Sequence, residues 1–147
     1  LSNVLSAPCT GRSLPTTTLS SLRKHRVTKS LNIGQTVECY ALNYLKKAGL
    51  STITQNWSCR FGEIDLIMLE QDTVVFVEVR YRKSSYFGGA LESIDQHKRR
   101  KLLKTAESFL NENPNWLEHA CRFDVITAQP SQPETFKLDW IQDAFES

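Results

Sequence analysis

Two carboxylates in neighbouring strand-like runs of this sequence could together bind a divalent cation. The first run, residues 62–67, carries Asp65, and the run that follows it carries Glu78 among valines. If the runs form an antiparallel hairpin in which Leu69 pairs with Val74, Asp65 lies directly opposite Glu78, with Cβ atoms about 5 Å apart. Carboxylates this close repel each other, and a hard cation such as Mg²⁺ relieves the repulsion. The pattern therefore predicts a metal site built into a sheet.

Other charged residues surround this pair and leave two interpretations open. Glu63 lies on the same strand face as Asp65, and Glu38 would be a further carboxylate if its helix packs against the hairpin. In the other interpretation, Arg80 forms a salt bridge with Glu78 or Asp65 at the rim of the sheet. Such a pair would also relieve the cost of burying charge. That second interpretation predicts a structural role with no metal affinity.

The elements that must position these residues follow from hydrophobic periodicity and from capping residues. The expected elements are a helix over 32–48, strands over 52–58, 63–69 and 73–81, a loop over 82–93 with two glycines, a helix over 95–111, and strands over 122–128 and 136–141. This order predicts an α/β fold, with the hairpin in the middle of a mixed sheet. The helix before residue 122 allows a parallel crossover.

Basic residues concentrate just after the hairpin. Residues 80–104 contain eight Lys or Arg against two acidic residues, although the net charge of the whole chain is only +2. Such a local positive field attracts polyanions, and together with a metal site it suggests a phosphate substrate. The candidate nucleic-acid contacts are Arg82, Lys98, Arg99, Lys101 and Lys104. A solvated helix face with no binding role is the alternative.

The remaining composition limits the class of protein. The 147 residues fit one domain over 31–147, preceded by a Ser/Thr-rich, basic extension over 1–30 that we expect to be poorly ordered. Four widely spaced cysteines form no C-x-x-C pair, and no apolar run reaches the roughly 20 residues of a membrane span. We therefore expect a cytoplasmic protein. Zinc-protease, P-loop and dinucleotide-binding motifs are missing from the sequence.

A set of motifs resembles the YraN-like family, which is placed among the PD-(D/E)xK restriction-endonuclease-like nucleases. The matching residues are Glu38, Gly62-Glu63-Ile64-Asp65-Leu66-Ile67, Val77-Glu78-Val79-Arg80, Phe87-Gly88, Lys98 and Arg122-Phe123-Asp124-Val125. The resemblance covers about residues 31–142. It implies a three-layer fold with a central mixed sheet between helices.

By position, the resemblance gives each candidate site residue a role. Asp65 and Glu78 would be ligands of Mg²⁺ or Mn²⁺, joined by the Val79 carbonyl, and Glu38 would be the helix carboxylate. Arg80 stands where the superfamily has its catalytic lysine. An arginine keeps its proton, so Arg80 could stabilise charge but could not act as a base.

These roles predict a metal-dependent nuclease that hydrolyses DNA phosphodiester bonds with a preference for branched or single-strand-containing structure, as in repair or recombination. A homodimer fits this function, because cutting both strands needs two sites. Arg80 also supports an alternative, a catalytically weak DNA-binding module that acts with a repair partner.

Overall fold

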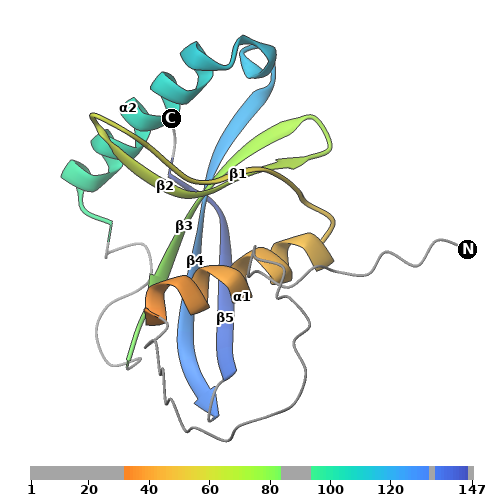
Figure 1. Cartoon of the computed structure of the whole chain (residues 1–147), viewed down its shortest axis with the longest axis vertical. Helices are drawn as coiled ribbons and strands as arrows, with labels where there is room; N and C mark the ends of the chain where they lie inside the picture. The colour runs from red at the N-terminus through yellow and green to blue at the C-terminus, as the bar shows by residue number, and fades with distance from the viewer. Residues whose placement is uncertain (1–31, 84–93, 133–134, 146–147) are drawn as a thin grey trace, which may run out of the picture. The chain divides into compact units, whose positions relative to one another are not determined.

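The computed structural model describes residues 32–83, 94–132 and 135–145 as helices and strands of a mixed α/β unit (Figure 1). The elements are α1 (Ile33–Lys47), β1 (Ser51–Cys59), β2 (Gly62–Glu70), β3 (Thr73–Tyr81), α2 (Gln96–Glu112), the 3₁₀ helix η1 (Pro114–Trp116), β4 (Ala120–Gln132) and β5 (Thr135–Phe145). The predictions for residues 1–30 and for the glycine-containing loop lie outside the described residues.

The five strands form one sheet in the order β1-β2-β3-β4-β5. β3 pairs with β4 in parallel, and the other neighbouring pairs are antiparallel. Since α2 lies between β3 and β4 in the chain, the predicted parallel crossover is confirmed. β3 is the central strand, and its five successive residues 74–78 are buried. A strand that is buried on both faces is expected to have a continuous apolar sequence, and this strand has one.

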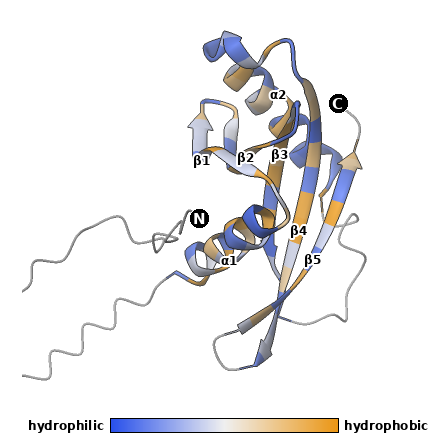
Figure 2. Ribbon diagram, turned by 90° about the vertical axis from the view of Figure 1, so that its right-hand side faces the viewer, coloured by the Kyte–Doolittle hydropathy of each residue, from blue (hydrophilic) through white to orange (hydrophobic). Residues whose placement is uncertain are grey.

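One helix covers each face of the sheet, which gives the three layers seen in Figures 1 and 2. On one face, Leu102 and Phe109 of α2 share a core cluster with Phe76 of β3. On the other face, Leu45 of α1 shares a second cluster with Val77. Consecutive residues of β3 thus point to different helices. By this alternation, the even-numbered residues that follow Phe76 face α2.

Capping residues fix both helix starts. Asn32 accepts a hydrogen bond from the Gly34 N–H, and Asp95 accepts one from the Lys98 N–H. Side-chain oxygens at this position satisfy N–H groups that have no partner inside the helix. α1 ends within one residue of the predicted position, and Gly49, which follows the C-cap Ala48, has a φ of 105°. The first turn of α2, which carries the basic cluster, is therefore set at Asp95.

The last two strands are longer than predicted. β4 and β5 run from Ala120 to Phe145 with a short connection, instead of over 122–128 and 136–141. The C-terminal end of β4 is exposed, so it lacks the apolar alternation that marks a buried strand. Backbone pairing of β4 with β5 extends the strands beyond the buried core. A similar difference affects the β2–β3 turn, where Glu70 pairs with Thr73 and leaves a two-residue loop.

Candidate functional site

The hairpin register predicted from the sequence is confirmed. Leu69 pairs with Val74 and Leu66 with Val77, so the next position along the register is Asp65 opposite Glu78. The paired ladder ends at this point. The Asp65 Oδ2 atom instead accepts a hydrogen bond from the backbone N–H of Val79 at 2.7 Å. A carboxylate has thus taken the place of a strand carbonyl where β2 and β3 separate.

The neighbouring strand β1 is also irregular beside Asp65. Its pairs with β2 continue on both sides of Asn56, but Asn56 has a φ of 49°, in the left-handed region. Ile64 and Ile67 of β2 both belong to the core cluster under α2, although strict alternation would place them on different faces. The strand therefore turns locally between these two residues. Asp65 lies within this irregular stretch.

Glu78 is the buried acceptor of the site, with a side chain that is 7% exposed. The Lys98 Nζ atom lies 2.5 Å from its Oε1 atom, and the Arg80 Nε atom lies 3.3 Å from the same oxygen. The Arg80 Nε atom makes no hydrogen bond within the described residues, so its contact with Glu78 is one of charge proximity. Lys98 is therefore the better-placed cation. The alternative contact that the sequence suggested, between Arg80 and Glu78, is also present.

The structure gives Lys98, a predicted phosphate contact, a partner that the sequence did not indicate. Its ammonium group reaches the Glu78 carboxylate. The Asp95 cap holds the Lys98 backbone in the first turn of α2, which directs this side chain toward β3. A lysine from a helix and an arginine from the strand thus approach the same carboxylate oxygen.

Glu38 joins the carboxylates from the α1 side of the sheet. Partial burial raises its pKa, and the charges of Glu63 and Glu78 raise it further, while a hydrogen bond from the Asn56 side chain opposes them. Carboxylates on both strands of the hairpin therefore contribute to the raised pKa of Glu38. Glu38 thus interacts electrostatically with Glu63 and Glu78 across the hairpin, and its place in a metal site stays a prediction.

Asp65 has the most perturbed charge in this group. Burial, followed by repulsion from Glu78, raises its pKa to about 7, although the Val79 N–H and the Lys98 charge act in the other direction. The Lys98 charge lowers the pKa of Asp65 but does not outweigh burial and the Glu78 charge. A bound divalent cation would lower this pKa further, because it favours the ionised carboxylate.

The side chains available as ligands limit how such a cation would be held. Within residues 32–83, 94–132 and 135–145, no three His, Cys, Asp or Glu side chains form a ready chelating group. Mg²⁺ commonly binds through one or two carboxylates and keeps several waters, so the Asp65–Glu78 pair with a main-chain carbonyl is compatible with Mg²⁺. A zinc-like cage of protein side chains is not present in this part of the chain.

The pKa of Asp65 predicts how stability changes with pH in the absence of divalent cations. Between the unfolded value of 3.8 and about 7, the folded protein holds a proton on Asp65 that the unfolded chain has lost. The contribution of Asp65 to the free energy of unfolding should therefore fall as pH rises through this window. Asp65→Asn keeps an acceptor for the Val79 N–H but does not ionise.

Urea unfolding in EDTA, at several pH values from 4 to 8, tests this prediction. Asp65→Asn should gain stability relative to wild type as pH rises, by roughly 1.4 kcal/mol for each pH unit over which Asp65 keeps its proton. The two proteins should unfold with similar m-values, so that midpoints can be compared. Parallel pH profiles would mean that Asp65 ionises normally in the folded protein.

The other basic residues proposed for nucleic acid occupy different environments. Lys101 and Lys104 are exposed on α2. Arg99 turns back, donating from Nε to the Ile94 carbonyl and lying over the Phe145 ring at 5.5 Å. The Arg82 backbone N–H bonds to Ala128, which extends the β3–β4 pairing. Lys101 and Lys104 are thus the residues of this set best placed to meet a polyanion in solution.

Gly62 lies where α2 approaches the start of β2. A Cβ atom added at Gly62 would lie 3.2 Å from the Thr105 hydroxyl of α2. That hydroxyl is fixed, because it donates to the Lys101 carbonyl at 2.7 Å. The small residue lets α2 lie close to the beginning of the strand that carries Asp65.

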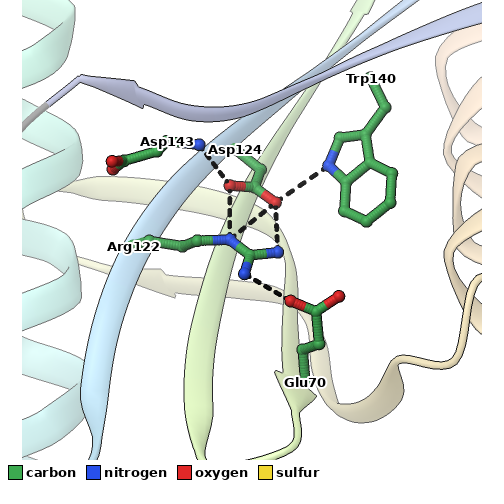
Figure 3. Close-up of polar contacts among 5 residues, drawn as sticks. All are labelled: Glu70, Arg122, Asp124, Trp140 and Asp143. Carbon is green, nitrogen blue, oxygen red and sulfur yellow. Dashed lines mark hydrogen bonds and ion pairs between the residues drawn. The ribbon is translucent and has the colours of Figure 1, made fainter.

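A second charged cluster, around Asp124, has no counterpart in the sequence predictions beyond its place in a matching motif. Asp124 is 1% exposed and receives hydrogen bonds from Arg122, the Trp140 indole and the Asp143 N–H, as Figure 3 shows. Arg122 also pairs with Glu70 of β2. An aspartate inside the apolar run of β4 is the only sequence signal for this cluster. Its saturated contacts indicate a structural role.

Comparisons with known proteins agree over the part of the chain that carries the site. A family model described as "Uncharacterised protein family UPF0102" matches residues 37–128. A UPF0102 protein of Stutzerimonas stutzeri is 49% identical over 122 residues, 82% of this chain and 100% of that protein. One of Ectopseudomonas mendocina is 52% identical over 116 residues, 79% of this chain and 96% of that protein. These names state no activity. Within the part of the chain that the structure describes, no helix is long and apolar enough to cross a membrane.

Proposed function

The chain belongs to the uncharacterised protein family UPF0102, and from the geometry of its carboxylate site we propose that it is a metal-dependent, restriction-endonuclease-like nuclease acting on DNA. The observation that carries the proposal is the meeting of Asp65, Glu78 and Lys98 where β2 and β3 separate. Carboxylates can hold a metal ion that activates water, and an ammonium group can stabilise the charge that develops on a phosphate. They come from two strands and a helix.

The carboxylates would hold the metal. Asp65, Glu78 and the Val79 carbonyl would bind Mg²⁺ or Mn²⁺, with Glu38 as a further carboxylate beside them. When bound, the ion supplies an activated water and polarises the phosphate. Asp65 must lose its proton to serve as a ligand, and its pKa of about 7 makes this step sensitive to neutral pH.

The cations would act on the phosphate. Lys98 and Arg80, both beside Glu78, would stabilise the negative charge that develops on the phosphoryl oxygens. Lys101 and Lys104, exposed further along α2, would position the DNA backbone without reading its sequence. A structural preference for branched or single-strand-containing DNA is compatible with such contacts. The homodimer and the cytoplasmic location stay predictions.

Two other functions remain to be tested against this one. Arg80 supports a DNA-binding module that has lost turnover, because no lysine follows Glu78 in the strand. The Arg80–Glu78 contact supports a purely structural role for the ion pairs. A purely structural role for the ion pairs does not account for the raised pKa of Asp65, because both ion pairs are made to Glu78.

One set of assays separates the three functions. Purified protein is mixed with linear, flapped and branched DNA in Mn²⁺, Mg²⁺ or EDTA, and Mn²⁺ binding is measured by calorimetry. A nuclease should bind Mn²⁺, cut at least one DNA and lose both properties in Asp65→Ala and Glu78→Ala. A binding module should retain salt-sensitive DNA affinity without cutting. Equal Mn²⁺ behaviour in wild type and both variants would leave only the structural role.

A further inference from the structure

The two edges of the sheet differ in how regular they are. β1, at one edge, has a register shift between Thr52 and Thr54 and a φ of 49° at Asn56. Irregularities of this kind hinder an edge strand from pairing with another chain. β5, at the other edge, pairs regularly with β4 from Phe136 to Ile141, and among the described strands it pairs with β4 alone (Figure 2). The outer backbone of a regular edge strand is a template for a further strand.

We propose that this edge is a self-association surface, at which β5 of a second copy of the chain pairs antiparallel with β5 across a two-fold axis. The sheets of the two copies would then be continuous. An axis perpendicular to the sheet keeps each side chain on its own face, so even-numbered residues pair with even-numbered residues. The axis must therefore pass through one residue that pairs with its own copy. The surface does not depend on the proposed nuclease function.

The charges of β5 select the residue at the axis. With the axis at Leu138, Lys137 of each copy lies opposite Asp139 of the other. These two side chains are 68% and 49% exposed, so both charges are accessible to a second chain. An axis at Lys137 or at Asp139 would bring two like charges face to face, which is unfavourable. An axis at Trp140 would place Lys137 opposite Asp143, which lies beyond the regular pairing of β5 and has a φ of 49°.

Aromatic residues on the α1 face of β5 fit the same register. Phe136 of one copy would lie opposite Trp140 of the other, and cross-strand aromatic pairs stabilise antiparallel strands. Both rings are half-buried and pack against Tyr40 and Tyr44 of α1, with ring centroids 5.1 and 6.2 Å apart. The tyrosines are themselves 38% and 41% exposed. Aromatic side chains are enriched at protein interfaces, so α1 would extend the contact beyond the paired backbone.

Sedimentation velocity on the full chain, at a series of concentrations, tests the proposal. Wild type should form a dimer. Asp139→Lys and Lys137→Asp should each raise the dissociation constant of the dimer by about 100-fold or more, because each places like charges on both sides of the interface. Charge reversal is needed, because the loss of one exposed ion pair is worth less than about 1 kcal/mol. Glu107→Lys, an equal change of charge at an exposed position of α2, should leave the dimer intact.

An equal mixture of Asp139→Lys and Lys137→Asp separates a contact between copies from an effect within one chain. The first variant carries lysine at both positions and the second carries aspartate at both. A mixed pair with the axis at Leu138 therefore restores opposite charges at every position. The mixture should form dimers at concentrations where each variant alone is a monomer, and circular dichroism should show that both variants are folded.

Hydrogen exchange on wild type provides a measurement that needs no variant. Exchange of the backbone N–H groups of β5 should slow as the concentration rises, because the second strand protects them, whereas exchange in β1 should not change. Three results would each overturn the proposal. These are a wild type that stays monomeric at every concentration, a dimer that Asp139→Lys leaves intact, and a mixture of the two folded variants that does not associate.

Discussion

Replacing Lys98 with methionine should slow Mn²⁺-dependent DNA cleavage by a factor of about 10² or more, the usual scale for the loss of one transition-state charge contact. Methionine keeps the length and apolar stem of the side chain but has no charge. The Lys98 ammonium group is the cation closest to Glu78, at 2.5 Å, and therefore lies nearest to where phosphate charge would develop. Single-turnover rates on the preferred DNA would measure the effect.

Lys101→Met is the matched control for Lys98→Met. Lys101 lies one turn further along the same helix and is exposed, so its loss should weaken DNA binding and flatten its salt dependence. At saturating DNA, the rate of the Lys101 variant should stay close to that of wild type. If Lys98→Met cleaves at the wild-type rate, or if Lys101→Met loses as much, Lys98 is only a binding residue.

Arg80 variants complete this test. Arg80→Ala should also lose a factor of about 10², because it removes the second cation beside Glu78. Arg80→Lys should retain activity or raise it, since the charge is kept. Should Lys98→Met be inactive while Arg80→Ala remains fully active, the helix lysine alone supplies the catalytic charge. The reverse pattern would return that role to the strand residue.

The opposition of Asp65 and Glu78 could be predicted from the sequence because both residues lie in one hairpin. A two-residue alternation and a short turn fix the register, and each strand needs only its immediate neighbour. The parallel crossover joins residues far apart in the chain, such as Thr73 and Ala120, and followed from the order of the elements, because a helix between two strands allows them to pair in parallel.

The contacts of Lys98 and Asn56 could not be predicted in this way. Lys98 meets Glu78 only after α2 has crossed to its face of the sheet, and the periodicity of α2 marks its buried side without saying which basic residue points to the strand. The Arg80 contact could be predicted, because Arg80 follows Glu78 by two residues and therefore lies on the same face of the strand. Asn56 adopts a positive φ inside a strand, where sequence patterns predict regular backbone.

The cluster around Asp124 shows the same limit more clearly. Trp140 and Asp143, which donate to Asp124, lie 16 and 19 residues away, and Glu70 lies 52 residues before Arg122. None of these spacings has a local signature. The cluster also explains why β5 continues past residue 141, because the Asp143 N–H is held by the Asp124 carboxylate.

Asp124→Asn should therefore destabilise the folded protein by about 3 kcal/mol or more, the scale for breaking a buried ion pair by changing one partner. The Asp124 carboxylate accepts from Arg122, Trp140 and Asp143, all of which are donors. Asparagine has the same shape, but it brings an NH₂ group among these donors and leaves the Arg122 charge with Glu70 alone. Urea unfolding followed by tryptophan fluorescence and circular dichroism would measure the loss.

Asp139→Asn, in the neighbouring edge strand β5, is the control, because Asp139 is about half exposed and its Lys137 partner is 4.0 Å away. It should change stability by less than about 1 kcal/mol, as exposed ion pairs do. Replacing Arg122 and Asp124 together with leucine should recover part of the loss, since no unpaired charge then remains at Asp124. If Asp124→Asn is as mild as Asp139→Asn, the cluster does not stabilise the fold, and the burial of Asp124 would point to a role in function instead.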